Sequence, residues 1–241
     1  MHLSIHDFAK MIEFSLVRPD ATDRDMEEFC RIVRENNFAT ACINPVNVSL
    51  TAELLKEADT DIDISASIGF PFGSHIPEIK AFEAKRAIEM GATQIDMVIN
   101  IGALKSGKDE IVSEDIKKVV EISGDILVKV ILENGFLTDE EKIRGCRIAK
   151  DAGASFVKTS TGVESKYLLE RGSESIGATV KDVKLMKEVA GEKLKVKASG
   201  RIHTLDFALE LIRAGADRLG TSKGPKLIQE FKERFGDFVK L

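Results

Sequence analysis

Eight short runs of apolar and β-branched residues recur along this chain of 241 residues, separated by longer runs with helical periodicity. Their starts lie roughly 25–40 residues apart, which is the spacing of strands joined by crossover helices. Such units make a parallel sheet, and eight of them predict an α/β fold, a (β/α)8 barrel forming a single domain over residues 1–241. The predicted strands are Ile12–Leu16, Phe38–Ile43, Asp63–Ile68, Ile95–Ile99, Ile126–Leu132, Ser155–Ser160, Leu194–Ser199 and Arg218–Ser222.

The segments between the predicted strands carry helix start signals. Thr138 followed by Glu141 fits a capping box, and Thr22 with Asp25 is a weaker version of the same pattern. An open, doubly wound sheet is the alternative architecture. That alternative lacks support, because no GxGxxG sequence opens a helix in this chain.

Composition limits the partners of the chain. With 35 basic and 40 acidic residues, the net charge is −5, so no strong basic field attracts nucleic acid. No apolar run approaches the roughly 20 residues that a membrane helix needs, and Asp7 and Lys10 interrupt any signal-peptide pattern. The cysteines, Cys30, Cys42 and Cys146, are widely spaced and form no CxxC motif, which favours a reducing cytoplasmic location.

Strand parity predicts charged side chains inside the barrel. Side chains alternate between the two faces of a strand, and this alternation turns a set of ionisable residues inward from neighbouring strands. A barrel interior is usually filled by Val, Ile and Leu, and a buried charge is costly unless it is paired. We therefore expect a functional site formed by Asp96, Lys129, Glu133, Lys158 and Lys197.

Lys158 is the predicted nucleophile of this site. It ends an inward-facing strand, at the end of the barrel where active sites lie, and a desolvated lysine beside a second cation can act as a neutral amine. Lys197 on the next strand supplies that cation, and Asp96 is the predicted general acid and base. Lys129 and Glu133 are expected to orient Asp96 and the amine. The alternative is a set of ordinary ion pairs without chemistry.

The loops after the last two predicted strands, ASGRIHT and GTSKG, suggest an anion site. Gly200 allows backbone amides to approach a phosphate, Ser222 offers a hydroxyl, and Arg201 and Lys223 add positive charge. Gly162 can contribute from the loop after the sixth strand. The alternative for each loop is ordinary turn chemistry.

Metal chemistry is not expected. His2 and His6 have helical spacing at the N-terminus, His75 and His203 are isolated, and none of them has a carboxylate partner at metal-ligand spacing. Cys42 faces inward and is expected to pack as a small apolar group.

The motifs LVRPDAT, CINP, GFPFG, EAKRAIEMGATQIDMVINIGALKSG, LVKVILENGFLTDEE, AGASFVKTSTG, KASGRI and ADRLGTS together resemble the deoxyribose-phosphate aldolase family, from about Met11 to about Gly224. The resemblance implies a metal-free class I aldolase of nucleotide catabolism, without a cofactor, in a (β/α)8 barrel. It would cleave 2-deoxyribose 5-phosphate to glyceraldehyde 3-phosphate and acetaldehyde through a lysine Schiff base. Its only partners would be this phosphorylated sugar and further copies of the chain, as a dimer or tetramer.

The resemblance also implies roles for particular residues. Lys158 matches the Schiff-base lysine, Lys197 the second lysine and Asp96 the proton-relay aspartate. Lys129 and Glu133 match the supporting pair of the family.

The chain departs from the family pattern at several positions. Glu13 and Ser15 stand where the family usually has an aspartate and a threonine, so Ser15 is a candidate contact for the substrate. Arg201 replaces the second of two glycines, and Lys223 replaces a common serine.

The segment 163–176 is roughly seven residues longer than the usual connection and contains Tyr167, the only tyrosine. These departures keep two alternatives open. One is a related Schiff-base aldolase acting on another phosphorylated sugar or a keto acid, and the other is a non-catalytic phosphosugar-binding barrel.

Overall fold

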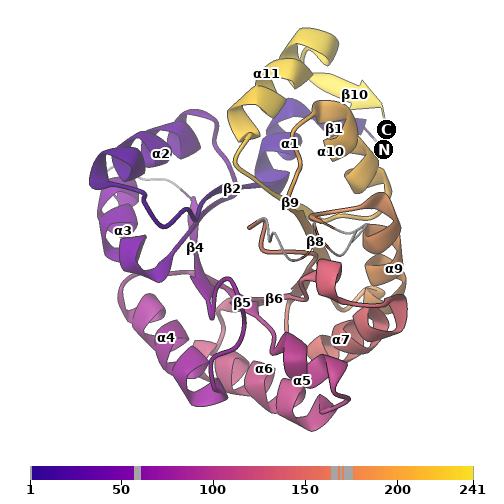
Figure 1. The fold of residues 1–241 in the computed structure, drawn as a ribbon. Helices are drawn as coiled ribbons and strands as arrows, with labels where there is room; N and C mark the ends of the chain where they lie inside the picture. The colour runs from indigo at the N-terminus through magenta and orange to yellow at the C-terminus, as the bar shows by residue number, and fades with distance from the viewer. Residues whose placement is uncertain (1, 57–60, 164–167, 169, 171–175, 241) are drawn as a thin grey trace.

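The computed structural model describes residues 2–56, 61–163, 168, 170 and 176–240. Within them, eight parallel strands close a barrel in chain order, with β9 returning to pair with β2, and the helices surround it (Figure 1). The predicted (β/α)8 barrel is confirmed. Its strands are β2 Ile12–Leu16, β3 Thr40–Ile43, β4 Asp63–Ile68, β5 Gln94–Val98, β6 Leu127–Ile131, β7 Phe156–Lys158, β8 Lys195–Ser199 and β9 Arg218–Thr221.

The helices lie between consecutive strands, outside the barrel (Figure 1). They are α1 Ile5–Met11, α2 Asp23–Glu35, α3 Val48–Lys56, α4 Pro77–Glu89, α5 Ile101–Lys105, α6 Asp109–Ser123, α7 Asp139–Asp151, α9 Val180–Ala190, α10 Leu205–Arg213 and α11 Gly224–Phe235, with the 3₁₀ turns η1 Pro45–Asn47 and η2 Asn134–Phe136. Both expected capping boxes are present: the Thr22 and Thr138 side chains accept from the backbone of Asp25 and Glu141, which reciprocate.

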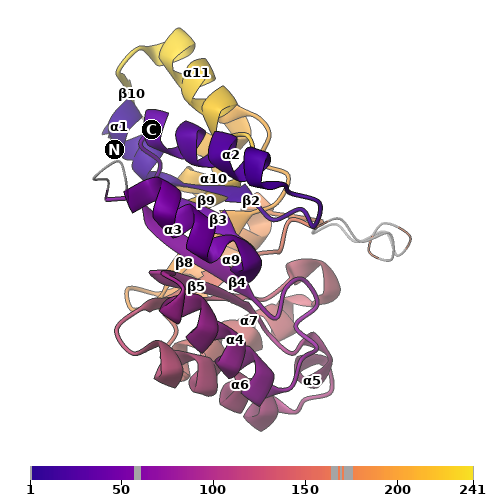
Figure 2. The ribbon, with the colours of Figure 1, turned by 90° about the vertical axis from the view of Figure 1, so that its left-hand side faces the viewer.

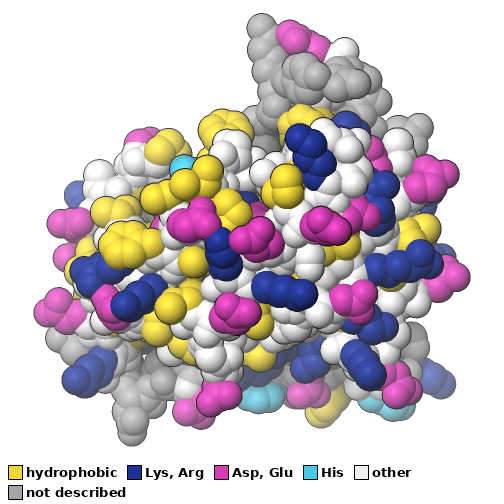
Figure 3. Space-filling model, turned by 90° about the horizontal axis from the view of Figure 1, so that it is seen from below, with side chains coloured by type: hydrophobic (Ala, Val, Ile, Leu, Met, Phe, Trp, Pro, Cys, Tyr) yellow, Lys and Arg dark blue, Asp and Glu magenta, His cyan; other side chains and the backbone are white. Residues whose placement is uncertain are grey.

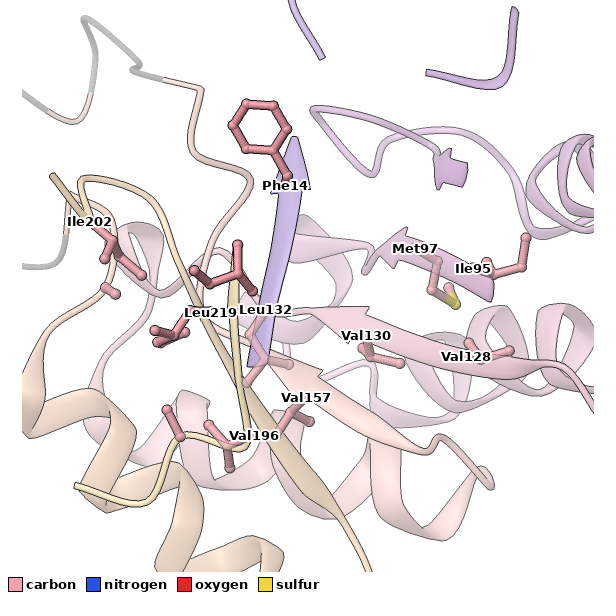
Figure 4. Close-up of a cluster of buried hydrophobic side chains, with 14 of the residues drawn as sticks. Phe14, Ile95, Met97, Val128, Val130, Leu132, Val157, Val196, Ile202 and Leu219 are labelled. Atoms are coloured by element: carbon pink, nitrogen blue, oxygen red, sulfur yellow. The ribbon is translucent and has the colours of Figure 1, made fainter. Parts of the chain in front are cut away.

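Strand parity is as the sequence predicts in the layer between the barrel and the helices. Figure 4 shows Ile95 and Met97 on β5 and Val128 and Val130 on β6 among the side chains of this apolar layer. All four are at most 2% exposed. Since alternate residues fill this layer, the intervening side chains point into the barrel. The polar and charged residues of the site are among those intervening side chains.

A second, two-stranded sheet, which was not predicted from the sequence, lies at one end of the barrel (Figure 2). β1 His2–Ser4 pairs antiparallel with β10 Phe238–Lys240, so the termini lie together, away from the loops that follow the barrel strands (Figure 2). The expected helical spacing of His2 and His6 is wrong, because His2 lies in β1 and only His6 lies in α1. Strands of three residues are too short to give a periodic signal.

The helices in the described part of the chain include none that is long and apolar enough to span a membrane.

Candidate active site

A cluster of charged side chains occupies the inside of the barrel. Asp96 on β5 contacts the amines of Lys129 on β6, Lys158 on β7 and Lys197 on β8. Glu13 on β2 contacts the Lys129 and Lys197 amines from the other side. The Lys158 side chain is 4% exposed and the other four are at most 1% exposed. We call these five residues the charged cluster.

Asp96 is the centre of the charged cluster. Its Oδ2 accepts from Lys158 Nζ at 2.7 Å and from Lys197 Nζ at 2.6 Å, so the two amines share one oxygen. Its Oδ1 accepts from Lys129 Nζ at 2.9 Å and from Ser65 Oγ at 2.7 Å. Burial raises the pKa of the Asp96 carboxyl, but the three ammonium groups outweigh burial and hold that pKa well below its usual range. Asp96 is therefore an anion at neutral pH.

Glu13 is a member of the cluster that strand parity alone did not assign. Its Oε2 accepts from Lys197 Nζ and lies 3.4 Å from Lys129 Nζ. Burial raises the pKa of the Glu13 carboxyl, but Lys129 and Lys197 outweigh it and leave that pKa below its usual value. Its inward position on the first barrel strand was the available signal, although the partners come from strands far away in the sequence.

Lys197 is held as a cation. Burial lowers the pKa of its amine, but Asp96 and Glu13 outweigh burial and raise that pKa above its usual value. Lys197 therefore suits the predicted role of charged neighbour and not that of nucleophile. Lys158 ends β7 at the predicted position, and its Nζ lies within proton-transfer distance of Asp96.

Glu133 lies outside the charged cluster. It was expected to orient Asp96 and the amine, but among the described residues it makes no hydrogen bond or ion pair with Asp96, although the charge of Lys158 acts on its carboxyl group. In the described residues, the Asp96 carboxylate is hydrogen-bonded by Ser65 and the three lysines, with Cys42 Sγ at 3.9 Å. Glu133 instead accepts from the backbone N–H of Thr161 at 2.8 Å. The reason is its backbone, which has a φ of 55° and ends the alternation of β6 one residue after Leu132.

A cavity of about 270 Å³ opens beside the charged cluster, between the ends of β2, β7, β8 and β9. Four of the five predicted anion-site residues line it, namely Gly162, Gly200, Arg201 and Ser222, and so does Ser15, the predicted contact for the substrate. Lys223 is not among the lining residues. Its backbone N–H donates to Thr221 Oγ1, directly before α11, and its side chain is exposed.

Backbone geometry explains the glycine in the loop after β8. Gly200 has a φ of 90°, and a Cβ there would lie 2.9 Å from both Ser160 Oγ and Gly177 Cα. Arg201 has a φ of 59°, which glycine adopts most easily. Both residues therefore bring the β8 loop close to the β7 loop around the cavity.

Several cavity residues were missed by sequence reasoning, among them two with ionisable side chains. Arg18, in the loop after β2, lines the cavity and forms ion pairs of 2.7 Å with Asp20 and Asp25. His203, in the loop after β8, also lines it. Both follow barrel strands, and Arg18 also lies in the motif LVRPDAT. Tyr167 lies outside the described residues.

The described residues contain no group of three or more His, Cys, Asp or Glu side chains that could hold a metal ion.

Comparisons with known proteins agree with this geometry. Residues 6–230 match the family described as DeoC/LacD family aldolase. A deoxyribose-phosphate aldolase of Caldanaerobacter subterraneus subsp. tengcongensis is 47% identical over 234 residues, or 96% of each chain. One from Methanothermobacter thermautotrophicus is 46% identical over 226 residues, or 94% of this chain and 96% of that one. A solved tetrameric deoxyribose phosphate aldolase from Aeropyrum pernix has 31% identity and a TM-score of 0.84, covering 95% of this chain and 92% of that one.

Proposed function

Because this chain belongs to the DeoC/LacD family of aldolases, which are carbon–carbon lyases, we propose that it reversibly cleaves 2-deoxy-D-ribose 5-phosphate to D-glyceraldehyde 3-phosphate and acetaldehyde. The observation that carries the proposal is the shared oxygen of Asp96. It holds one amine at the end of β7, Lys158, beside a second amine, Lys197, that is kept charged. Lys158 is thus the amine nucleophile, Lys197 its cationic neighbour and Asp96 the proton acceptor of the proposed reaction.

The reaction follows from that arrangement. Lys158 Nζ adds to C1 of the open-chain aldehyde, and loss of water gives a protonated imine. The C3 hydroxyl then gives its proton to Asp96, the C2–C3 bond breaks, and the electron pair of that bond moves into the imine to form an enamine. Glyceraldehyde 3-phosphate leaves, C2 of the enamine takes up a proton, and hydrolysis returns acetaldehyde and the free amine.

Each member of the charged cluster has a separate role in this proposal. Asp96, ionised and 2.7 Å from Lys158 Nζ, accepts and returns protons during imine formation and hydrolysis. Lys197 supplies positive charge beside the imine nitrogen. Lys129 holds the other oxygen of Asp96, and Glu13 balances the two supporting lysines.

We assign the phosphate of the substrate to the 270 Å³ cavity. Gly162 and Gly200 expose backbone at its wall, Ser222 offers a hydroxyl, and Arg18 and Arg201 bring positive charge. We assign Ser15, which also lines the cavity, a contact with the sugar of the substrate.

The test is borohydride trapping with 2-deoxyribose 5-phosphate, followed by intact mass and peptide mapping. The expected result is one stable adduct on Lys158. It should be lost in Lys158→Ala and kept in Lys195→Ala, a matched control because Lys195 lies on the neighbouring strand β8 but is exposed. An adduct only with another phosphorylated sugar or a keto acid would favour the related aldolase. No adduct with any carbonyl compound would favour a binding barrel.

We also propose that the chain forms a homo-oligomer in a reducing cytoplasm. Five large apolar side chains are 49–79% exposed on η1, the β4–α4 loop and α4, namely Val46, Phe72, Ile76, Ile79 and Phe82. Apolar side chains gather on this side of the molecule, at the left of Figure 3. An exposed patch of this kind favours association with a second copy, and the Aeropyrum pernix relative is tetrameric.

Light scattering after size exclusion tests the assembly. Phe82→Glu, on α4, should reduce the mass of the particle. Ile122→Glu should not, because Ile122 is an exposed apolar residue on α6, outside the patch. A monomeric wild type, or equal effects of both variants, would contradict the assignment of this patch.

A further inference from the structure

The loop after β6 is joined to the loop after β7 by successive hydrogen bonds. The Leu132 N–H donates to the Lys158 carbonyl at 3.0 Å, and the Asn134 N–H donates to the Thr159 carbonyl at 2.9 Å. The next bond runs in the opposite direction, because the Thr161 N–H donates to the side chain of Glu133 at 2.8 Å. Two bonds are therefore backbone pairs that any sequence can make, whereas the third depends on one side chain.

Glu133 is built into this position at a cost. It is a carboxyl group only 6% exposed, and its φ of 55° is uncommon for a residue other than glycine. Burial raises the pKa of its carboxyl, although the hydrogen bonds from Thr161 and the charge of Lys158 lower it in part. A buried carboxyl group on a backbone with positive φ is unfavourable on both counts, which indicates that Glu133 makes a specific contact.

The residues after Thr161 explain what the contact controls. Thr161 and Gly162 line the 270 Å³ cavity, and Thr161 Oγ1 accepts from the Val163 N–H at 3.1 Å. Lys158 lies three residues earlier on the same strand and loop. The position of the Thr161 backbone therefore sets the separation between the amine of Lys158 and the wall of the cavity.

We propose that Glu133 is a positioning residue that fixes the β7 loop, and so sets the spacing between the Lys158 amine and the substrate phosphate. This inference rests on the proposed function, and it assigns Glu133 a different task from orienting Asp96. Glu133 acts as a hydrogen-bond acceptor here, and its charge is not needed. Phosphate binding is separated from imine formation in this arrangement, because the Lys158 amine keeps its ion pair with Asp96 in the charged cluster.

The experiment compares Glu133→Gln with Glu133→Leu, using 2-deoxyribose 5-phosphate and unphosphorylated 2-deoxyribose as substrates. Gln keeps an acceptor oxygen for the Thr161 N–H, and Leu has a similar size without one. We expect Glu133→Gln to stay within about threefold of wild type in kcat/KM for the phosphorylated sugar. Glu133→Leu should lose about 10- to 100-fold, mostly through KM, as for a buried donor left unpaired, and its preference for the phosphorylated sugar should fall by a similar factor.

Borohydride trapping of acetaldehyde on each variant is the companion measurement, because it reports on Lys158 without the phosphate and without turnover. Adduct yields near wild type in both variants would agree with a positioning role. Loss of kcat in Glu133→Gln comparable to that in Glu133→Leu, or an altered pH profile of kcat in Glu133→Gln, would overturn the inference in favour of proton transfer by Glu133. Equal phosphate preference in wild type and Glu133→Leu would also overturn it. Failure of the wild type to cleave the sugar would instead reject the proposed function.

Discussion

Replacing Glu13 by Gln tests whether the charged cluster is a mutually dependent set of ions. The substitution keeps the shape of the side chain and removes one of the two carboxylates that face the described amines of Lys129, Lys158 and Lys197. Asp96 would then be the remaining carboxylate of the charged cluster for three amines whose side chains are at most 4% exposed. Breaking a buried ion pair from one side costs about 3–5 kcal/mol, because the remaining charge stays buried.

The assay is urea unfolding at pH 7. With an m value of about 3 kcal/mol per M, the loss corresponds to a midpoint about 1–2 M lower at unchanged m. Glu28→Gln is the matched control, because it breaks an ion pair with Arg31 on the surface of α2, where solvent screening leaves far less to lose. If Glu13→Gln and Glu28→Gln shift the midpoint equally, the cluster is not held by its charges and the reasoning fails.

The pH dependence of the difference in unfolding free energy between wild type and Glu13→Gln gives a second check. The pKa of Glu13 is lowered on folding from its usual value of 4.5, so its stabilising contribution is present above pH 4.5 and lost as the pH falls through the lower folded value. Lys197 has a raised pKa, so its contribution is present below its usual value of 10.5 and lost only as the pH rises through the folded value. The gap between wild type and Glu13→Gln should therefore be constant from pH 6 to 9 and narrow in acid.

Other perturbations address the chemistry and the cavity. Asp96→Asn should lower kcat by about 10²-fold or more, as for a lost acid–base group, and an unchanged rate in steady-state assays would reduce Asp96 to an ion-pair partner. Gly200→Ala should cost about 1–3 kcal/mol in thermal unfolding, because its φ of 90° strains a side chain that also meets Ser160 and Gly177. It should also raise KM for the phosphorylated sugar, and normal values of both would contradict the close packing of these loops. Excess EDTA should leave the wild-type rate unchanged, and inactivation would point to a metal-dependent reaction.

Local rules were sufficient for most of the fold. The period of two along a strand is a property of the backbone, so the inward directions of Asp96, Lys129, Lys158 and Lys197 could be predicted without any contact information. The same rule failed at Glu133, because a left-handed residue ends the alternation there. No sequence pattern predicts a positive φ for a glutamate. The hydrogen bond from Thr161 to Glu133 depends on this φ and could not be predicted either.

The sequence by itself determined the repeating strand–helix order, the strand bounds to within two residues, and the inward direction of Asp96, Lys129, Lys158 and Lys197. Only the tertiary structure decided which side chains form ion pairs with one another inside the barrel. Glu13 and Lys197 are 184 residues apart and meet because closure of the barrel pairs β2 with β9, the neighbour of β8. The same closure places the three-residue strands β1 and β10 side by side. A local sequence pattern predicts the direction of a side chain, because the alternation along a strand is a property of the backbone. Its partner across the barrel depends on how the strands pair when the barrel closes.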